Sequence, residues 1–338
     1  MTGGRGRALR VALAALLVAG CSATGPTAAP VTSGSPPNGA SRSPAFTSAS
    51  APPASSSSAA SSSSPASPAS SAAAARPAFA HIYLLILENH EYGAIVGSDD
   101  AQYLNGLYER YGLVTAMHAV THPSEPNYIT LVSGGTQGVH DDGVYNLDAV
   151  SLFDQVEAGG RSWHVYAQGY PGSCSTVAST DEVADGPGRP GDYARKHNPA
   201  ISFTSISRNP ARCARITGLA GFDPAAADLE MIVPNQINDM HSASVRTGDD
   251  FLAAFLPSIL ESSAFTAGSL LIVTFDEGTS NDGGGGHVAT LMATPGMVPG
   301  TRFDAPATHD SVLRTIEDAW GMAPLGGAAG SSAIAVTP

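Results

Sequence analysis

Lysine is nearly absent from this sequence of 338 residues, because Lys196 is the only one. Acidic residues are missing from the first 87 positions, and the first carboxylate is Glu88. The segment from Glu88 onward carries 29 acidic and 11 basic residues, a net charge of −18. It lacks the basic surface with which proteins bind nucleic-acid phosphates, so we expect no nucleic acid partner. Any cation that this segment needs must come from arginine or from a metal ion.

The amino-terminal region has no hydrophobic run of membrane-spanning length. Its apolar run, residues 11–19, follows three basic residues, Arg5, Arg7 and Arg10. A helix of this length rises about 14 Å, whereas the hydrocarbon core of a bilayer is about 30 Å thick. A short apolar run behind a basic segment is typical of a signal peptide. We therefore predict a signal peptide over residues 1–20 and export of the protein.

Cysteines are few: the chain has Cys21, Cys174 and Cys213. The small residues 18–20 before Cys21 resemble a bacterial lipobox, in which the cysteine receives lipid and becomes the new amino terminus. We predict lipidation of Cys21, which would anchor the protein to the outer face of the cell membrane. Ordinary cleavage nearby, with Cys21 unmodified, is the alternative. Lipidation of Cys21 leaves Cys174 and Cys213 as a pair that can form a disulfide.

Charged and aromatic side chains are scarce in residues 22–75, where Arg42 is the only charged residue and nearly all others are Ser, Ala, Pro, Thr or Gly. Such a composition cannot offset the entropy lost on ordering the chain. About 250 residues beyond it suffice for one α/β domain. The predicted parts are a lipidated and disordered tether over 21–78, a folded domain over 79–325, and a flexible tail over 326–338.

Strand and helix patterns alternate along the predicted domain. Apolar runs of strand length lie at residues 81–87, 163–166, 229–233, 270–275 and 287–292. Helical patterns lie at residues 102–111, 151–158, 249–262 and 311–320. Nearly continuous apolar strands are typical of sheets that are covered on both faces. The sequence therefore predicts an α/β fold with a mostly parallel central sheet and helices on both faces.

Polar pairs directly follow two of these predicted strands. Glu88-Asn89 follows the first strand, and Asp276-Glu277 follows the strand at residues 270–275. Active sites of α/β folds collect at the carboxyl ends of the strands. Carboxylates are costly there unless they are neutralised, and oxygen ligands suit a hard divalent cation. Either pair alone is explained by helix caps or a solvated loop, but the two together favour a metal site.

A serine precedes a predicted helix in the segment Ser124-Glu125-Pro126. Serine is favoured at the amino-terminal cap of a helix and proline in its first turn, so we expect Ser124 to cap this helix. A hydroxyl in that position faces the free amides and the dipole that attract phosphate. Alone this is an ordinary capped helix. The two acidic pairs make it a candidate for phosphate chemistry.

Six motifs occur in a fixed order along the domain. They lie at residues 88–90 (ENH), 124–128 (SEPNY), 195–199 (RKHNP), 233–241 (VPNQINDMH), 275–278 (FDEG) and 308–318 (THDSVLRTIED). Together they resemble the phosphoesterase family of bacterial acid phosphatases and phospholipases C, within the alkaline-phosphatase superfamily. The closest likeness is to secreted acid phosphatases that act on phosphatidylinositol 3-phosphate. The resemblance covers about residues 80–322 and implies an alkaline-phosphatase-like fold.

The resemblance also implies a nucleophile and a metal site. Ser124 matches the hydroxyl residue that attacks phosphorus in related phosphoesterases. The residues that would hold a divalent metal ion beside it are Glu88, Asn89, Asp276 and Glu277. A bound cation lowers the pKa of a hydroxyl and neutralises charge on the phosphoryl oxygens. Glu91 departs from the family pattern, which has a small hydroxyl residue at this position.

Further roles are implied for residues of the later motifs. His197 and His241 would contact phosphate oxygens or protonate the leaving group, and Asp239 would orient His241. Asn235 and His309 would line the site. For His309, a cap on the helix that follows is an equal interpretation.

Three functions fit these observations. The first is a lipid-anchored acid phosphatase that removes phosphate from monoesters outside the membrane, with phosphatidylinositol 3-phosphate as a candidate substrate. The second is a phospholipase C or another phosphodiesterase on the same scaffold. The third is a surface lipoprotein that binds phosphate or metal without catalysis. A serine accompanied by both acidic pairs favours an enzyme. We expect a monomeric hydrolase of phosphoric esters.

Replacing Cys21 with alanine should move the protein from the membrane fraction to the soluble fraction, because the acyl chains could no longer be attached. Immunoblots of fractionated cells measure this distribution. Thr24→Ala, a substitution just outside the motif, is the control and should stay with the membranes. Mass spectrometry that finds an unmodified amino terminus at another residue would contradict lipidation.

Overall fold

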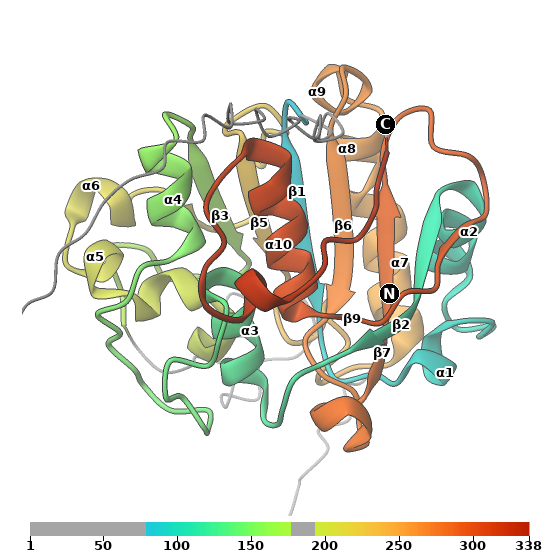
Figure 1. Ribbon diagram of the computed structural model, residues 1–338, viewed down its shortest axis with the longest axis horizontal. Helices are drawn as coiled ribbons and strands as arrows, with labels where there is room; N and C mark the ends of the chain where they lie inside the picture. Colours follow the sequence, from blue (N-terminus) through green and yellow to red (C-terminus); the bar gives the residue numbers. More distant parts are fainter. Residues whose placement is uncertain (1–78, 177–192, 338) are drawn as a thin grey trace, which may run out of the picture. The chain divides into compact units, whose positions relative to one another are not determined.

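A mixed sheet lies at the centre of the computed structural model, which describes residues 79–176 and 193–337 (Figure 1). The predicted signal peptide, Cys21 and the tether lie outside the described residues. Within the described part the strands are β1 (Ile82–Leu87), β2 (Gly112–His118), β3 (Trp163–Ala167), β4 (Ile216–Thr217), β5 (Leu229–Val233), β6 (Leu270–Phe275), β7 (His287–Ala293), β8 (Thr301–Phe303) and β9 (Ala307–Thr308). Their order is β4-β3-β5-β1-β6-β7-β2-β8, with β9 beside β2. Strand β7 runs antiparallel to β6 and β2, and the other pairs are parallel.

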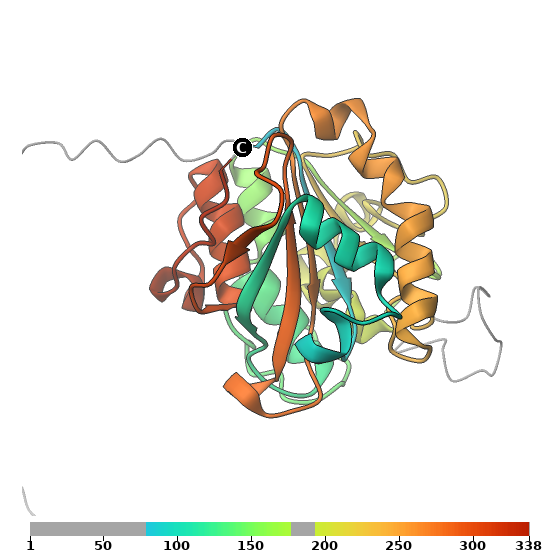
Figure 2. The same cartoon turned by 90° about the vertical axis from the view of Figure 1, so that its right-hand side faces the viewer.

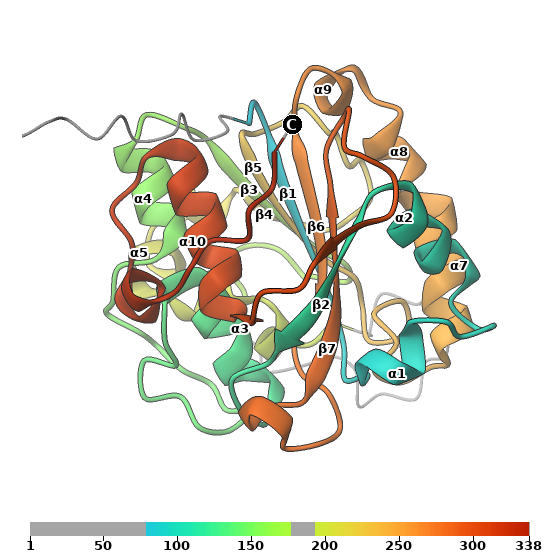
Figure 3. The ribbon, with the colours of Figure 1, turned by 45° about the vertical axis from the view of Figure 1, so that its right-hand side comes forward.

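Helices cover both faces of this sheet, as predicted. They are α1 (Tyr92–Ile95), α2 (Gln102–Arg110), α3 (Ser124–Ser133), α4 (Leu152–Ala158), α5 (Thr204–Ser207), α6 (Pro210–Cys213), α7 (Val245–Phe255), α8 (Pro257–Leu260), α9 (Ser263–Thr266) and α10 (His309–Trp320). Helices α3, α4 and α10 lie on one face, and α2, α7 and α8 lie on the other (Figures 2 and 3). None of the helices in the described ranges has the length and apolarity to cross a bilayer.

The predicted strands are confirmed, but four others were missed. The five apolar runs become β1, β3, β5, β6 and β7, and all side chains of β1, β5 and β6 are buried. Strand β2 was not predicted because its side chains alternate only partly between buried and half-buried positions. The short strands β4, β8 and β9 have two or three residues each and carry no readable period. The predicted fold class is nevertheless correct.

Two predictions about helix ends are wrong. The helix expected over residues 249–262 is broken: α7 ends at Phe255 and α8 begins at Pro257. Proline has no N–H for the helical ladder, so it starts a new helix rather than continuing the old one. Ser124 is not a cap either. It is the first residue of α3, and Pro123, whose side chain makes no capping hydrogen bond, holds the cap position.

The segment predicted as a flexible tail, residues 326–338, packs against the domain as far as it is described. Ile334 and Val336 are buried, and the Ile334 N–H donates to Thr315 Oγ1 at 2.8 Å. Two apolar side chains gain free energy by leaving water, which offsets the entropy of ordering this short segment. The sequence pattern is too sparse in apolar residues for this packing to be predicted.

The predicted disulfide between Cys174 and Cys213 is present, with the two Cα atoms 5.4 Å apart. Cys213 is the last residue of α6. The bond ties this helix to the loop that follows β3.

Glu230 places a carboxyl group inside the sheet, on β5. The residue is fully buried, and its Oε1 accepts the backbone N–H of Ala227 at 3.3 Å. Its Oε2 has no hydrogen-bond partner among the described residues. Burial raises the pKa of Glu230 to about 8, against the opposing effect of the Ala227 hydrogen bond and with a contribution from Asp223. The folded protein therefore holds this carboxyl in its protonated form near neutrality.

The free energy of unfolding should fall as pH rises from about 4.5 to about 8, because the unfolded chain releases the Glu230 proton over this range while the folded protein retains it. Glu230→Gln keeps an acceptor for Ala227 and cannot ionise, so its stability should fall less. Urea unfolding at pH 5 and pH 8 measures how the free energy of unfolding changes with pH in the parent and in Glu230→Gln. The exposed Glu261→Gln controls for the loss of one charge. Parallel slopes for the parent and Glu230→Gln would refute the assignment.

Candidate active site

Two buried carboxylates stand side by side at the carboxyl ends of the two central strands. Strands β1 and β6 pair in parallel through Leu87 and Phe275, so Glu88 and Asp276 follow at the same level. The Asp276 N–H donates to the carbonyl of Leu87 at 3.0 Å. Both acidic residues have no exposed surface. The sheet register alone therefore brings the two predicted polar pairs together.

Helix α3 brings Ser124 to the same place. The Ser124 hydroxyl lies 3.2 Å from Glu88 Oε2 and 3.3 Å from Glu277 Oε1, within hydrogen-bond distance of both. One helical turn further on, the Tyr128 hydroxyl donates to Glu88 Oε1. Residues four positions apart share one face of a helix. The serine hydroxyl that was expected to cap the helix therefore points at two carboxylates instead.

Asn89 adds an amide to this group. Its backbone N–H donates to Asp276 Oδ1 at 3.1 Å. One end of its side-chain amide lies 3.0 Å from Glu88 Oε2 and 3.1 Å from Asp276 Oδ1. With the nitrogen at that end, Asn89 donates to both carboxylates, and with the oxygen there, it joins them as a third oxygen ligand for a cation.

His197 and Asp239 lie on the other side of Glu88. His197 Nε2 is 3.2 Å from Glu88 Oε2, and His197 Nδ1 is 3.3 Å from Asp239 Oδ2. All three side chains are buried. Despite these distances, neither ring nitrogen has a hydrogen bond of good geometry with any described residue, and neither does Asp239 Oδ2. One ligand atom from each residue lies within 4.8 Å of the others, as the ligands of a common metal ion do.

The electrostatics of the site fit a cation. Burial first, then Asp276, then Asp239 raise the pKa of Glu88 well above its usual range. Burial and Glu277 raise the pKa of Asp276 to about 8, and burial raises that of Glu277. Burial lowers the pKa of His197 well below its usual range, so its imidazole is neutral and able to bind metal. A bound divalent cation would relieve the repulsion and give the unpaired nitrogens and oxygens a partner.

Sequence reasoning missed two residues that hold these carboxylates. His122 Nδ1 lies 2.6 Å from Glu277 Oε2, and its Nε2 lies 2.8 Å from the Ser280 carbonyl. Burial lowers the pKa of His122, but these two acceptors raise it above its usual value overall. Tyr128 is the other, and its position four residues after Ser124 was a usable signal. No sequence spacing marks His122, because its partners lie far along the chain.

His241 lies at the exposed side of the group. Its ring centroid is 5.8 Å from that of His197, and its side chain is exposed. The His241 backbone N–H donates to Asp239 Oδ1 at 2.8 Å, and its Nδ1 lies 3.0 Å from Ser242 Oγ. Asp239 thus contacts the backbone of His241 with one oxygen and faces His197 with the other.

Asn235 and His309 support the site from outside it. The Asn235 side-chain oxygen accepts the Asn238 N–H at 3.0 Å and shapes the turn that carries Asp239. His309 is buried at the start of α10, and its Nε2 lies 3.1 Å from the carbonyl of Phe275, directly before Asp276. It does not cap the helix, because Thr308 holds that position.

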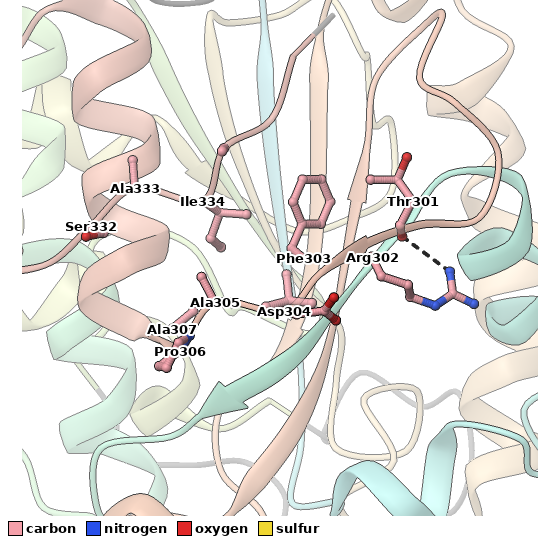
Figure 4. Close-up of a pocket in the computed structure, with 12 residues that line it drawn as sticks. Thr301, Arg302, Phe303, Asp304, Ala305, Pro306, Ala307, Ser332, Ala333 and Ile334 are labelled. Atoms are coloured by element: carbon pink, nitrogen blue, oxygen red, sulfur yellow. Dashed lines mark hydrogen bonds between the residues drawn. The ribbon is translucent and has the colours of Figure 1, made fainter.

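Two cavities among the described residues lie away from this group. One of about 410 Å³ is lined by β8, the segment after it and residues 332–335, with Phe303 and Ile334 among its walls (Figure 4). Another of about 740 Å³ lies beside the disulfide. Neither is lined by a residue of the carboxylate group. Chemistry, rather than cavity size, therefore locates the candidate site.

Known proteins resemble this chain in sequence. A sequence model described as the phosphoesterase family matches residues 94–323. The chain is 31% identical over 256 residues to the phosphatidylinositol-3-phosphatase of Mycobacterium tuberculosis, covering 75% of this chain and 80% of that protein. It is 30% identical over 262 residues to an acid phosphatase of Aspergillus fumigatus, covering 74% of this chain but only 56% of the fungal protein.

A solved structure shows the same fold at low identity. The phosphonate monoester hydrolase of Silicibacter pomeroyi superposes with a TM-score of 0.50 and 11% sequence identity, covering 75% of this chain and 76% of that one. At this identity the likeness concerns the fold alone.

Tyr128→Phe should lower the free energy of unfolding by about 1–3 kcal/mol, because it keeps the ring packed on His197 but leaves buried Glu88 Oε1 without its donor. Urea denaturation measures the change. Tyr108→Phe is the matched control: this tyrosine is also buried, but its hydroxyl has no partner within the described ranges. Tyr108→Phe should leave the free energy of unfolding unchanged. Equal losses in both variants would show that the hydroxyl of Tyr128 does not support Glu88.

Proposed function

The chain belongs to the phosphoesterase family and is a hydrolase of phosphoric ester bonds, and from this premise we propose that it is a phosphomonoesterase with Ser124 as its nucleophile. The observation that carries the proposal is the position of the Ser124 hydroxyl between two carboxylate oxygens, Glu88 Oε2 and Glu277 Oε1. Serine is a weak nucleophile unless a neighbouring group accepts its proton. Either carboxylate is close enough to do so.

In the first step Ser124 Oγ bonds to phosphorus while its proton passes to Glu277 or Glu88. The bond between phosphorus and the ester oxygen breaks, and that oxygen takes its electron pair and a proton. His241 is suited to donate this proton because it lies at the exposed side of the group, where a leaving alcohol would depart. The product of this step is phosphoserine and a free alcohol.

In the second step water hydrolyses the phosphoserine. The water oxygen bonds to phosphorus and keeps one of its protons, while the other proton passes to His241. The bond between phosphorus and Ser124 Oγ breaks, and the proton held by the carboxylate returns to Oγ. Inorganic phosphate leaves and the site is restored. Burial raises the pKa of Glu277, which favours a group that takes up a proton and later returns it.

A divalent metal ion fits this arrangement of side chains. The residues proposed to hold it are Glu88, Asn89, Asp276 and Glu277, and the group of Glu88, His197 and Asp239 offers an overlapping set of ligand atoms. Such an ion would neutralise charge on the serine oxygen and on the phosphoryl oxygens. Glu88 belongs to both sets. Its conversion to alanine would disturb metal binding and the proton acceptor at once.

The substrate and location are proposed from the relatives and the amino-terminal sequence. The mycobacterial relative, at 31% identity, is a phosphatidylinositol-3-phosphatase, and phosphatidylinositol 3-phosphate is the first substrate to test. The predicted lipid anchor on Cys21 would hold the domain outside the cell membrane, near such lipids. The relatives that are acid phosphatases favour phosphomonoesters over phosphodiesters as the substrate class.

Ser124→Ala should reduce hydrolysis of p-nitrophenyl phosphate by several orders of magnitude, because the covalent route is lost. The fold should persist, since the Ser124 side chain does not cap α3. Steady-state rates with circular dichroism test both points. Acid quenching should also trap phosphoserine in the parent protein and not in the variant.

The matched control is Ser133→Ala, the same substitution in the last position of the same helix, where the hydroxyl bonds only to backbone carbonyls on its donor side. It should keep near-normal turnover. Substantial turnover by folded Ser124→Ala would refute the covalent mechanism and favour direct attack by water.

A further inference from the structure

Asp142 holds two hydrogen-bond donors beside the proposed nucleophile. It lies in the irregular segment between α3 and α4, and its Oδ1 accepts the backbone N–H of Glu125 at 3.0 Å. Glu125 follows Ser124 in the first turn of α3. The other oxygen, Oδ2, accepts a hydrogen bond from Lys196 Nζ at 2.9 Å. An amide at a helix amino terminus and an ammonium group are donors with which proteins bind phosphate.

Lys196 is the only lysine of the chain, and its charge acts on the site. It opposes the rise in the pKa of Glu88 and of Asp239. Burial lowers the pKa of Lys196 itself, but the hydrogen bond and charge of Asp142, followed by Glu88, raise it overall. A phosphate dianion entering this acidic surrounding needs such a cation. In this structure the Asp142 carboxylate already accepts a hydrogen bond from Lys196.

Access to the nucleophile also requires a movement. Ser124 is only 1% exposed, so a phosphoryl group cannot meet its hydroxyl while the surrounding groups stay in place. The side chain of Asp142 is 31% exposed, and its neighbours in the chain are mostly exposed and outside any helix or strand. Asp142 can therefore turn into solvent without disturbing a packed element.

We propose that Asp142 competes, within the molecule, with the phosphoryl group of the substrate. Its carboxylate holds Lys196 and the Glu125 amide until a phosphate dianion displaces it and takes both donors. The inference rests on the proposed function, since it concerns the same phosphoryl site. It makes Asp142 a residue that weakens the binding of substrate and of product phosphate, and so aids product release.

The strength of the competition follows from the exposure of the pair. Lys196 and Asp142 are 18% and 31% exposed, and partly exposed ion pairs are weak enough to exchange. Asp142→Asn keeps an oxygen for the Glu125 amide and removes the negative charge. It should lower the Kd for inorganic phosphate about three- to tenfold, and the KM for p-nitrophenyl phosphate in the same direction. Titration calorimetry of the full-length, metal-loaded protein measures the Kd.

Asp141→Asn is the matched control. It removes the same charge one residue earlier, where the carboxylate accepts a hydrogen bond from Tyr145 instead of from Lys196 or the Glu125 amide. Its phosphate affinity should stay within about twofold of the parent value. A gain equal to that of Asp142→Asn would mean that loss of charge in general, and not competition, strengthens binding, and would overturn the proposal.

Lys196→Gln tests the same contact from the other side. It should raise the Kd for phosphate severalfold, and adding Asp142→Asn to it should then change the Kd by less than about twofold, because the main shared donor is gone. The proposal would be overturned if Lys196→Gln left the Kd for phosphate unchanged. It would also be overturned if Asp142→Asn lowered this Kd as much in the Lys196→Gln protein as in the parent. A Kd for Asp142→Asn equal to or higher than that of the parent would overturn it as well.

Failure of the proposed function would look different. Turnover by Ser124→Ala would refute the covalent mechanism but would leave the ratio of phosphate affinities between Asp142→Asn and the parent unaffected. Equal affinities in a protein whose Ser124→Ala variant is inactive would refute the competition alone.

Discussion

The burial of several carboxylates at one edge of the sheet is the constraint on which the rest of the site depends. Glu88 and Asp276 end adjacent central strands and have no exposed surface. Removing one carboxylate from water is costly, and a second beside it adds repulsion, as the raised pKa values of both show. Each oxygen then requires a proton, a hydrogen-bond donor or a cation. The neighbouring side chains meet this requirement.

Helix α3 carries two of the hydrogen-bond donors that these carboxylates require. Ser124 and Tyr128 lie one turn apart on it and both contact Glu88, while His122, just before the helix, contacts Glu277. The helix is fully buried and packs against α10. One rigid element therefore sets the position of the nucleophile and of the donors that hold its two carboxylate neighbours, as a precise active site requires.

Only part of the fold and of the candidate site could be predicted from the sequence. The strand before Glu88 could be predicted because its unbroken apolar run has a local cause, burial on both faces. The capping role predicted for Ser124 was wrong, because its hydroxyl lies against carboxylates that only the folded chain brings near it. His122 had no signal at all. The break of the predicted helix at Pro257 was readable and was missed.

The sequence by itself determined the α/β class, the acidic residues at the ends of β1 and β6, and the motifs that carry the family resemblance, because each depends on residues close together in the chain. The tertiary structure alone decided that β1 lies between β5 and β6, that His197 and Asp239 approach Glu88, and that Asp142 meets Lys196. These contacts join segments far apart in sequence. Their geometry follows from strand order and helix packing, which no local pattern of side chains encodes.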